Sequence, residues 1–195
     1  MRHLSALSLA LFLSVTSLAA VAPAAAETAL PKEAKIDKTA KALKTFAPTV
    51  NPGHTDFDAA DRAAIANLLY AYSFAYDNYE ADAWFELFTP EVYFVAGMPG
   101  TPSLSFQGDD FRKFWRQRMA DFKTSGNQRR HLMSNILFLD QTETTAHISV
   151  AGLLTNVKDG KTASFVSSLN YEGWLVKGED GWKIKRWHDF PDAAF

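Results

Sequence analysis

The sequence contains no cysteine among its 195 residues. This absence excludes disulfides, thiolate nucleophiles, Cys-ligated zinc sites and Cys-ligated iron–sulfur clusters. An excess of basic charge is also missing, because 20 Lys and Arg stand against 22 Asp and Glu. The net charge of -2 therefore shows none of the basic character that is typical of a nucleic-acid partner. Any chemistry must use histidine, carboxylates, hydroxyls or the backbone.

Motifs for metals and nucleotides are missing as well. The five histidines form no HxH or HExxH pair, and the sequence contains no GxGxxG, Walker A or GxSxG motif. These absences argue against a zinc hydrolase, a nicotinamide enzyme, an ATPase and an α/β-hydrolase, so we expect neither a metal nor a cofactor. The 15 Phe, 6 Tyr and 5 Trp are instead enough apolar surface to build a folded core.

The first 26 residues have the pattern of a signal peptide. A basic start precedes an apolar run from Leu4 to Val21, and Ala24 to Ala26 form an A-x-A cleavage site. The alternative is a membrane anchor, since the run approaches ~20 residues. Pro23 and the alanines favour cleavage after Ala26, which predicts a periplasmic or secreted protein without a stable membrane anchor.

Residues 27–57 form a polar arm in which lysine recurs at every third position from Lys32 to Lys44. A thin apolar stripe accompanies the lysines, so we expect a solvated linker with one marginal helix. A role at a membrane surface is a weaker alternative, because the stripe is small. Pro48, Pro52 and Gly53 then break the chain before a domain over residues 58–195.

The first half of this domain has helical periodicity. Asp58 or Asp61 can cap a helix that ends at Asp77, and Asp109 can cap another that ends near residue 125. A short helix over 81–88 and a short strand over 92–95 lie between them.

The second half alternates with the period of strands. Four strands are predicted, with turn residues between them, over 130–139, 144–157, 162–176 and 182–189. Helices followed by an antiparallel meander predict an α+β domain with its helices on one face of the sheet. A strongly curved sheet would leave a pocket beneath the helices, where small molecules usually bind.

A carboxylate, a histidine and two tyrosines are the candidates for chemistry. Asp77 ends the first helix with Tyr76 and Tyr72 before it, while His131 opens a strand. A histidine paired with an aspartate is a proton shuttle, and tyrosine hydroxyls can stabilise a developing oxyanion. The alternative is structural: Asp77 ends a helix, His131 lies at a sheet edge and the tyrosines are core.

The chain resembles a known family over about residues 57–190. The resemblance runs through Asp61-Arg62, Tyr72, Tyr76-Asp77, Asp82-Ala83-Trp84 and Leu87-Phe88-Thr89-Pro90, and continues through Gly108-Asp109, His131-x-x-x-Asn135 and Gly181-Trp182-Lys183-Ile184. These stretches resemble SnoaL-like proteins of the nuclear transport factor 2-like superfamily. The resemblance implies a cone-shaped α+β barrel, in which helices pack on a strongly curved, mixed and mainly antiparallel sheet around an apolar pocket.

The resemblance also implies site residues. Tyr76-Asp77 matches a pair in scytalone dehydratase, the spacing from Tyr72 to Asp77 matches bile-acid 7α-dehydratase, and His131 matches the histidine that pairs with that aspartate. Where those enzymes place a second His or Asp, this chain offers only Asn156. The further candidates for substrate binding are Tyr171, Trp84 and Tyr93, of which Tyr93 could point in or out.

Two functions follow from this resemblance. The first is a cofactor-independent lyase or isomerase that acts by Asp/His proton transfer on a small apolar, aromatic or polycyclic, hydroxylated compound, with loss of water or of a one-carbon aldehyde. The alternative is a non-catalytic, exported small-molecule-binding or protein-interaction module on the same fold. An Asp77–His131 contact that faces an open cavity favours the enzyme, whereas Phe and Leu side chains filling the cone favour the alternative.

Some remaining polar residues are expected to lie outside the site. His147 alternates out of phase with the apolar residues of its strand, which predicts the opposite sheet face, and His188 and Asp189 are assigned to the pocket rim or to a partner surface. Self-association as a homodimer or homotrimer is also expected. It would cover Leu153, Val166 and Trp187, which one sheet face would otherwise expose to water.

Overall fold

A computed structural model describes residues 32–40 and 58–194. The predicted signal peptide and most of the polar arm lie outside this range. Within the described range, no helix combines the length and the apolar character needed to span a membrane.

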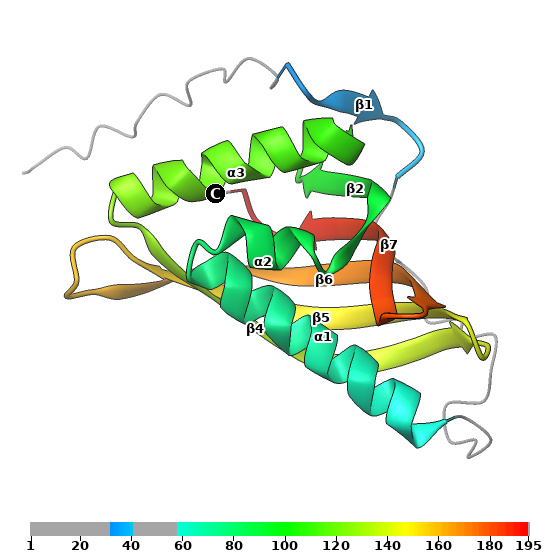
Figure 1. Ribbon diagram of the computed structural model, residues 1–195. Coiled ribbons are helices and arrows are strands. Elements are labelled where there is room, and N and C mark those ends of the chain that lie inside the picture. Colours follow the sequence, from blue (N-terminus) through cyan, green and yellow to red (C-terminus); the bar gives the residue numbers. More distant parts are fainter. Residues whose placement is uncertain (1–31, 41–57, 195) are drawn as a thin grey trace, which may run out of the picture.

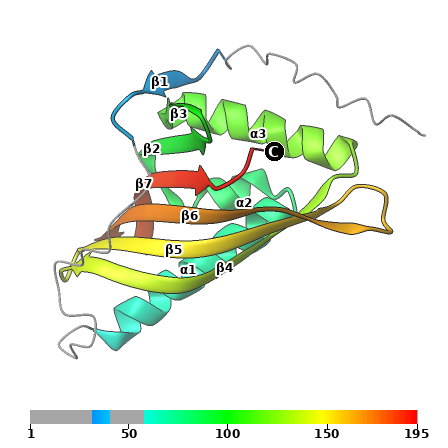
Figure 2. The same cartoon turned by 180° about the vertical axis from the view of Figure 1, so that it is seen from behind.

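The described residues form one mixed sheet of seven strands with three helices on one face (Figure 1). The helices are α1 (Ala59–Asp77), α2 (Ala81–Phe85) and α3 (Gly108–Thr124). The strands are β1 (Lys35–Asp37), β2 (Phe88–Met98), β3 (Thr101–Gln107), β4 (Gln128–Gln141), β5 (Thr145–Val157), β6 (Ala163–Gly178) and β7 (Gly181–Pro191). Within the part of the chain that the structure describes, the opposite face of the sheet carries no helix (Figure 2).

The sheet is open and has the strand order β1-β3-β2-β7-β6-β5-β4. Every neighbouring pair is antiparallel except β2 with β7, which is parallel. The predicted α+β class with a mixed, mainly antiparallel sheet is therefore confirmed. Irregular register interrupts several pairs, and Asn135 takes a φ of 50° within one such interruption of β4. Such bulges bend strands, which lets the sheet curve around the helices.

Asp58 caps the start of α1, so of the two predicted capping residues it is Asp58 and not Asp61 that caps the helix. The Asp58 side chain accepts hydrogen bonds from the backbone N–H groups of Ala60 and Asp61, at 2.7 and 3.2 Å. Asp61 is buried and has a different role, because its Oδ1 accepts from Trp182 Nε1 at 2.9 Å and lies 2.7 Å from Lys177 Nζ. These contacts attach the start of α1 to the β6–β7 hairpin.

The polar arm contains a strand where the sequence predicts a marginal helix. Residues 35–37 pair with β3, whose outer edge would otherwise leave its backbone groups unpaired. The Tyr93 hydroxyl donates to Asp37 Oδ2 at 2.5 Å, and Lys113 Nζ lies 2.7 Å from Glu33 Oε1. Residues 35–37 form a strand and not a helix because the edge of β3 supplies hydrogen-bond partners for their backbone. A local sequence pattern does not reveal such distant partners.

The predicted elements between the first and third helices differ from those in the structure. Helix α2 ends at Phe85 rather than residue 88, and β2 starts at Phe88 and runs through Pro90. Proline is tolerated there because the register between β2 and β7 is irregular from Phe88 to Tyr93. Strand β3 is absent from the predicted elements. Gly108, and not a residue after an Asp109 cap, is the first residue of α3.

An aromatic cluster fills much of the space between the helices and the sheet. Its rings come from α2, β2 and α3. The ring centroids are 4.8–5.3 Å apart in four pairs: Trp84–Phe88, Phe88–Phe111, Phe94–Trp115 and Trp84–Phe111. All of these side chains are buried. The sequence places Trp187 on an exposed face, but this expectation is wrong, since Trp187 is buried against Tyr72 and Tyr171.

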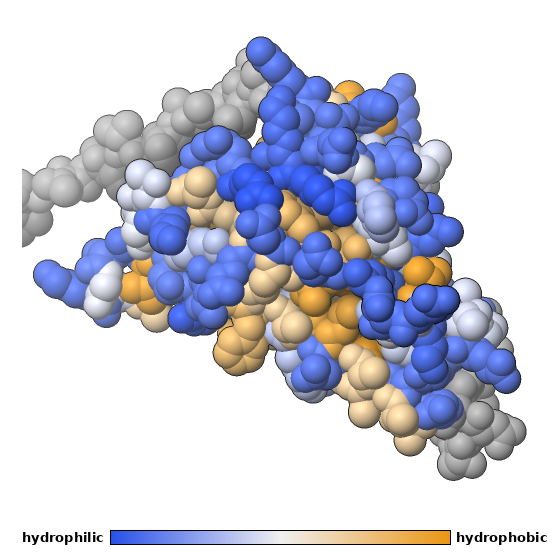
Figure 3. Space-filling model, in the orientation of Figure 1, coloured by the Kyte–Doolittle hydropathy of each residue, from blue (hydrophilic) through white to orange (hydrophobic). Residues whose placement is uncertain are grey.

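Apolar side chains remain exposed on both sides of the domain. On the helical side, hydrophobic surface gathers over α1, where Phe74 and Tyr70 are exposed (Figure 3). On the strands, Leu132, Leu153 and Phe165 are 53%, 47% and 64% exposed. Of the three residues used to predict self-association, only Leu153 is clearly exposed.

Gly173 provides a test of the packing around Trp187. A Cβ at this position would lie 2.6 Å from Trp187 Cζ3 and 3.2 Å from Ile148 Cγ1. Gly173→Ala is therefore expected to lower the free energy of unfolding by about 1–3 kcal/mol through overpacking. Gly178→Ala is the matched control, because nothing lies within 4 Å of its Cβ position. Equal melting temperatures for the two variants in calorimetry would contradict the close packing.

Candidate active site

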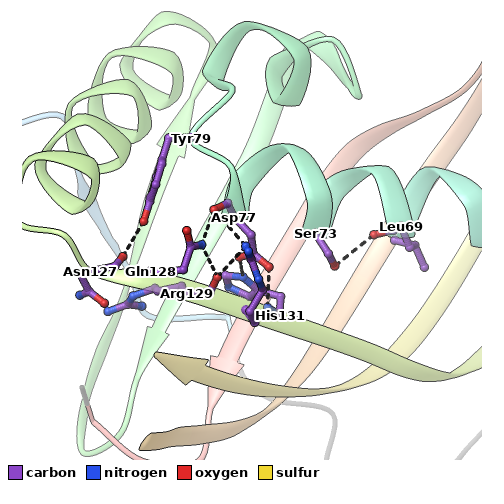
Figure 4. Close-up of polar contacts among 9 residues, drawn as sticks. Leu69, Ser73, Asp77, Tyr79, Asn127, Gln128, Arg129 and His131 are labelled. Atoms are coloured by element: carbon purple, nitrogen blue, oxygen red, sulfur yellow. Dashed lines mark hydrogen bonds and ion pairs between the residues drawn. The ribbon is translucent and has the colours of Figure 1, made fainter. Parts of the chain in front are cut away.

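The site is built where the end of α1 meets the start of β4. Asp77 Oδ1 lies 2.6 Å from His131 Nδ1, and Asp77 Oδ2 accepts a hydrogen bond from the backbone N–H of His131 at 2.7 Å (Figure 4). Both carboxylate oxygens therefore bind the same residue. Because a carboxylate accepts, Nδ1 carries the proton and Nε2 is the nitrogen that remains for other partners.

The local sequence explains why Asp77 is held so firmly. As the last residue of α1, it has a backbone carbonyl without a partner inside the helix. The side chain of Gln128 donates to this carbonyl at 2.7 Å, and Arg130 Nη1 lies 3.4 Å from it. The first residues of β4 thus close the end of α1 while the Asp77 side chain reaches across to His131 (Figure 4). Both side chains are almost completely buried.

A small cavity of about 30 Å³ lies beside this pair. Its lining combines apolar side chains with hydroxyl and charged groups. It is formed by residues of six elements: Tyr72, Tyr76, Trp115, Arg118, Arg129, His131, Leu154, Leu169 and Asp189. A volume of this size holds a water molecule or two. The aromatic cluster fills the adjoining space. A larger groove of about 530 Å³ between α2 and α3 contains neither Asp77 nor His131.

The cavity tyrosines are hydrogen-bond donors rather than acids. Burial raises the pKa of Tyr76 to about 12 and holds the pKa of Tyr72 well above its usual value. Tyr76 also packs edge-on against the His131 ring, with centroids 5.0 Å apart. Protonated phenols at these positions can donate to an oxygen on which negative charge develops.

Asp189 is a cavity residue that the sequence analysis assigned to the rim or to a partner surface. Its Oδ1 is buried and has no hydrogen-bond partner among the described residues. Burial raises the pKa of Asp189 to about 6, although the charges of His131, Arg118 and Arg129 act to lower it. Alternation along β7 could have revealed this, because Trp187 and Asp189 share one face and Arg186 and His188 the other.

The remaining predicted site residues separate into two groups. Tyr171 is buried next to Asp189 in the sheet register, and Trp84 contacts the rings of Tyr72 and Tyr76 without lining the cavity. Asn156 and Tyr93 lie elsewhere. Asn156 lies at the far end of β5, where its side chain accepts a hydrogen bond from Ser164. Tyr93 binds Asp37 of the arm.

The opposite sheet face carries a second polar cluster. His147 lies there, as predicted, with Nε2 2.8 Å from Glu172 Oε1. His188 is also on this face, where Arg186 Nε contacts its Nε2 at 2.7 Å. Burial and the Arg186 charge lower the pKa of His188 to about 4. Among the described residues, no group of three or more His, Cys, Asp or Glu side chains could hold a metal ion.

Comparison with known proteins identifies the family. Residues 58–188 match the model of the SnoaL-like domain. The chain belongs to the SnoaL-like domain family. No curated protein matches this SnoaL-like chain with significance.

Solved structures share the fold of this SnoaL-like domain. A protein from Novosphingobium aromaticivorans, provisionally named a scytalone dehydratase, is 20% identical with a TM-score of 0.56, and the match covers 68% of this chain and 84% of that one. ActVI-ORFA from Streptomyces coelicolor is 20% identical with a TM-score of 0.56, covering 69% and 98%.

A third similar structure belongs to a multisubunit protein. It is the β subunit of a provisionally named aromatic-ring-hydroxylating dioxygenase from Novosphingobium aromaticivorans, 13% identical with a TM-score of 0.59, covering 71% of this chain and 94% of that one. At such low sequence identities the similarity establishes only the fold. The reaction has to be inferred from the residues of the site.

The buried carboxyl of Asp189 predicts a pH-dependent effect on stability. Its pKa is raised on folding, so the folded state binds more protons than the unfolded state between about pH 4 and 6, and stability falls as pH rises through this window. Asp189→Asn removes this loss. We subtract the free energy of unfolding of the unmodified protein from that of the variant. This difference is expected to be about 2 kcal/mol larger at pH 7.5 than at pH 4.5.

Urea denaturation at the two pH values measures this difference. His188 titrates in an overlapping window with the opposite sign, because its lowered pKa makes stability fall as pH decreases. Each Asp189→Asn curve is therefore compared with the unmodified protein at the same pH. A stability difference that does not change with pH would show that Asp189 is not desolvated in the folded state.

Proposed function

We propose that this protein is a cofactor-independent lyase or isomerase of the dehydratase type. It acts by Asp/His proton transfer on a small, mostly apolar, hydroxylated compound. The observation that carries the proposal is the buried Asp77–His131 pair, in which both carboxylate oxygens hold a histidine that lines a cavity.

In this proposal, His131 is the group that moves the proton. Its Nε2 removes a proton from the substrate, and Asp77 stabilises the imidazolium that forms. Tyr72 or Tyr76 donates a hydrogen bond to the oxygen on which negative charge develops. The imidazolium then returns the proton to a leaving hydroxyl, so that a C–O bond breaks, a C=C bond forms and water is released.

Other outcomes of the same chemistry depend on the substrate. Removal of a proton from a terminal hydroxymethyl group allows the C–C bond to break, which releases formaldehyde and leaves a carbanion or enolate to take up the proton. Return of the proton to another carbon gives an isomer instead. All three outcomes need one base that can also act as an acid, held in one orientation.

A non-catalytic binding or interaction module is the second candidate, and a specific observation favours it. The cavity of about 30 Å³ is much smaller than the ~300–1,000 Å³ of ordinary ligand pockets, because the aromatic cluster occupies the rest of the space. An enzyme of this design must move side chains to admit a substrate. A module that binds a protein partner at its surface need not, whereas a small-molecule-binding module would need the same movement.

Export and self-association belong to the proposal as well. Export is inferred from residues 1–26 alone. Self-association is inferred from the exposed Leu132, Leu153 and Phe165, and light scattering at micromolar concentration is expected to give a dimer or trimer. A monomer throughout that range would refute it.

Mass spectrometry of the protein with a panel of aromatic diols and β-hydroxyketones tests the catalytic proposal. Loss of water or formaldehyde from one compound is expected, and Asp77→Asn and His131→Ala should each slow it by about 10²–10⁴-fold. His147→Ala is the matched control, since this histidine lies on the opposite sheet face.

The outcomes separate the candidates. Turnover that survives both substitutions would eliminate the Asp77–His131 mechanism. If no compound reacts and several raise the melting temperature, the non-catalytic binding module is the better description.

A further inference from the structure

The cavity beside His131 holds a second acid–base group, the carboxyl of Asp189. This residue comes from β7 and lines the cavity together with Tyr72, Tyr76 and His131. His131 comes from β4, and strands β6 and β5 lie between β7 and β4 in the sheet. The two groups therefore reach the same small space from different strands, so a ligand in the cavity can meet one on each side.

Asp189 differs from the other buried carboxylates of the described residues. Asp61, Asp77 and Glu172 each have a nitrogen atom at hydrogen-bond distance, between 2.6 and 2.9 Å from a carboxylate oxygen. The buried Oδ1 of Asp189 has no such partner within the described ranges. Buried polar atoms are nearly always hydrogen-bonded, so this oxygen indicates a partner that the described side chains do not supply.

The hydroxyl of Tyr171 shows the same feature next to Asp189. Tyr171 of β6 is the register partner of Asp189, which places both side chains on the same face of the sheet. Its hydroxyl is buried and also lacks a hydrogen-bond partner in the described part of the chain. Two neighbouring polar groups without partners favour a polar ligand atom at this place over a dry apolar interior.

The surroundings of Asp189 set when it carries a proton. Burial raises the pKa of Asp189 to about 6, and the charges of His131, Arg118 and Arg129 act to lower it. The anion therefore predominates at neutral pH, and the acid form becomes abundant as the pH falls towards 6. A group whose pKa lies near the working pH both gives and takes a proton readily. The charged and titratable groups that face it are Arg118 of α3, Arg129 and His131 of β4, Tyr171 of β6, and Tyr72 and Tyr76 of α1, while Asp77 is bound to His131.

We propose that Asp189 is the proton donor to the leaving hydroxyl, so that His131 and Asp189 divide the acid–base work between them. His131 Nε2 removes a proton from a substrate carbon, and the electron pair of that C–H bond forms the C=C bond. The C–O bond breaks with its electron pair on oxygen, which takes the proton of Asp189 and leaves as water. The imidazolium proton then passes through water to the Asp189 carboxylate, which restores the starting state. This role rests on the proposed function, in which the imidazolium alone returns the proton.

The pH dependence of turnover tests this role. The probe is the aldol adduct of benzaldehyde and acetone, a neutral β-hydroxyketone that loses water to give an absorbing enone and does not itself titrate. Because only the acid form of Asp189 donates, kcat/KM is expected to fall about tenfold per pH unit above its pKa of about 6. Asp189→Asn should lower kcat/KM about 10²-fold at pH 6 and should abolish this decline.

Asp192→Asn is the matched control, because Asp192 is an exposed carboxylate that follows shortly after Asp189 in the chain. It should keep both the rate and the decline with pH, and melting temperatures show whether each variant is folded. The pH profile separates a proton donor from a structural residue. If Asp189 only supports the packing, Asp189→Asn lowers the rate and leaves the decline with pH in place, which would overturn the inference.

The remaining outcomes separate this inference from the proposed function. If turnover depends on Asp77 and His131 while Asp189→Asn keeps the rate and the pH profile, the proposed function survives and the role of Asp189 is overturned. If Asp189→Asn abolishes the decline with pH while His131→Ala reacts normally, Asp189 stands as the proton donor and the Asp77–His131 mechanism fails. Absence of turnover with this adduct and with every compound of the panel would overturn both.

Discussion

The two-point contact between the Asp77 carboxylate and His131 is the constraint on which the site depends. One oxygen binds the imidazole and the other binds the backbone N–H of the same residue. The contact therefore fixes the imidazole and joins the end of α1 to the start of β4. At the other end of α1, Asp61 accepts from Trp182 and pairs with Lys177. The helix is attached to the sheet at both ends, which keeps its tyrosines over the cavity.

The aromatic interior sets the second constraint. Rings from α2, β2 and α3 pack against one another, and Trp187 of β7 joins Tyr72 from the sheet side. This packing stabilises the fold and reduces the cavity to about 30 Å³. Polar and charged groups then gather in the small remaining space. There the apolar surroundings raise the pKa of Asp189 and of the tyrosines, because burial disfavours charge.

Local signals in the sequence predict the elements that depend on local interactions. The capped start of α1, the long strands β4 to β7 and the turns between them follow from periodicity and turn residues, and the structure confirms them. The local pattern predicts neither β1 nor β3, and it predicts too short a range for β2. β1 and β2 depend on partners that are distant in sequence: β1 on the free edge of β3, and β2 on a parallel pairing with β7 that tolerates Pro90.

By itself, the sequence determined the α+β class, the family resemblance and the candidates Asp77 and His131, because motifs and alternation are local properties of a chain. Only the tertiary structure decided that these two residues, 54 positions apart, meet at hydrogen-bond distance. It also shows that Asp189, Arg118 and Arg129 line the same cavity and that Asn156 and Tyr93 lie outside it. The physical reason is that burial and charge environment arise where separate elements pack together, and spacing within one element does not contain that information.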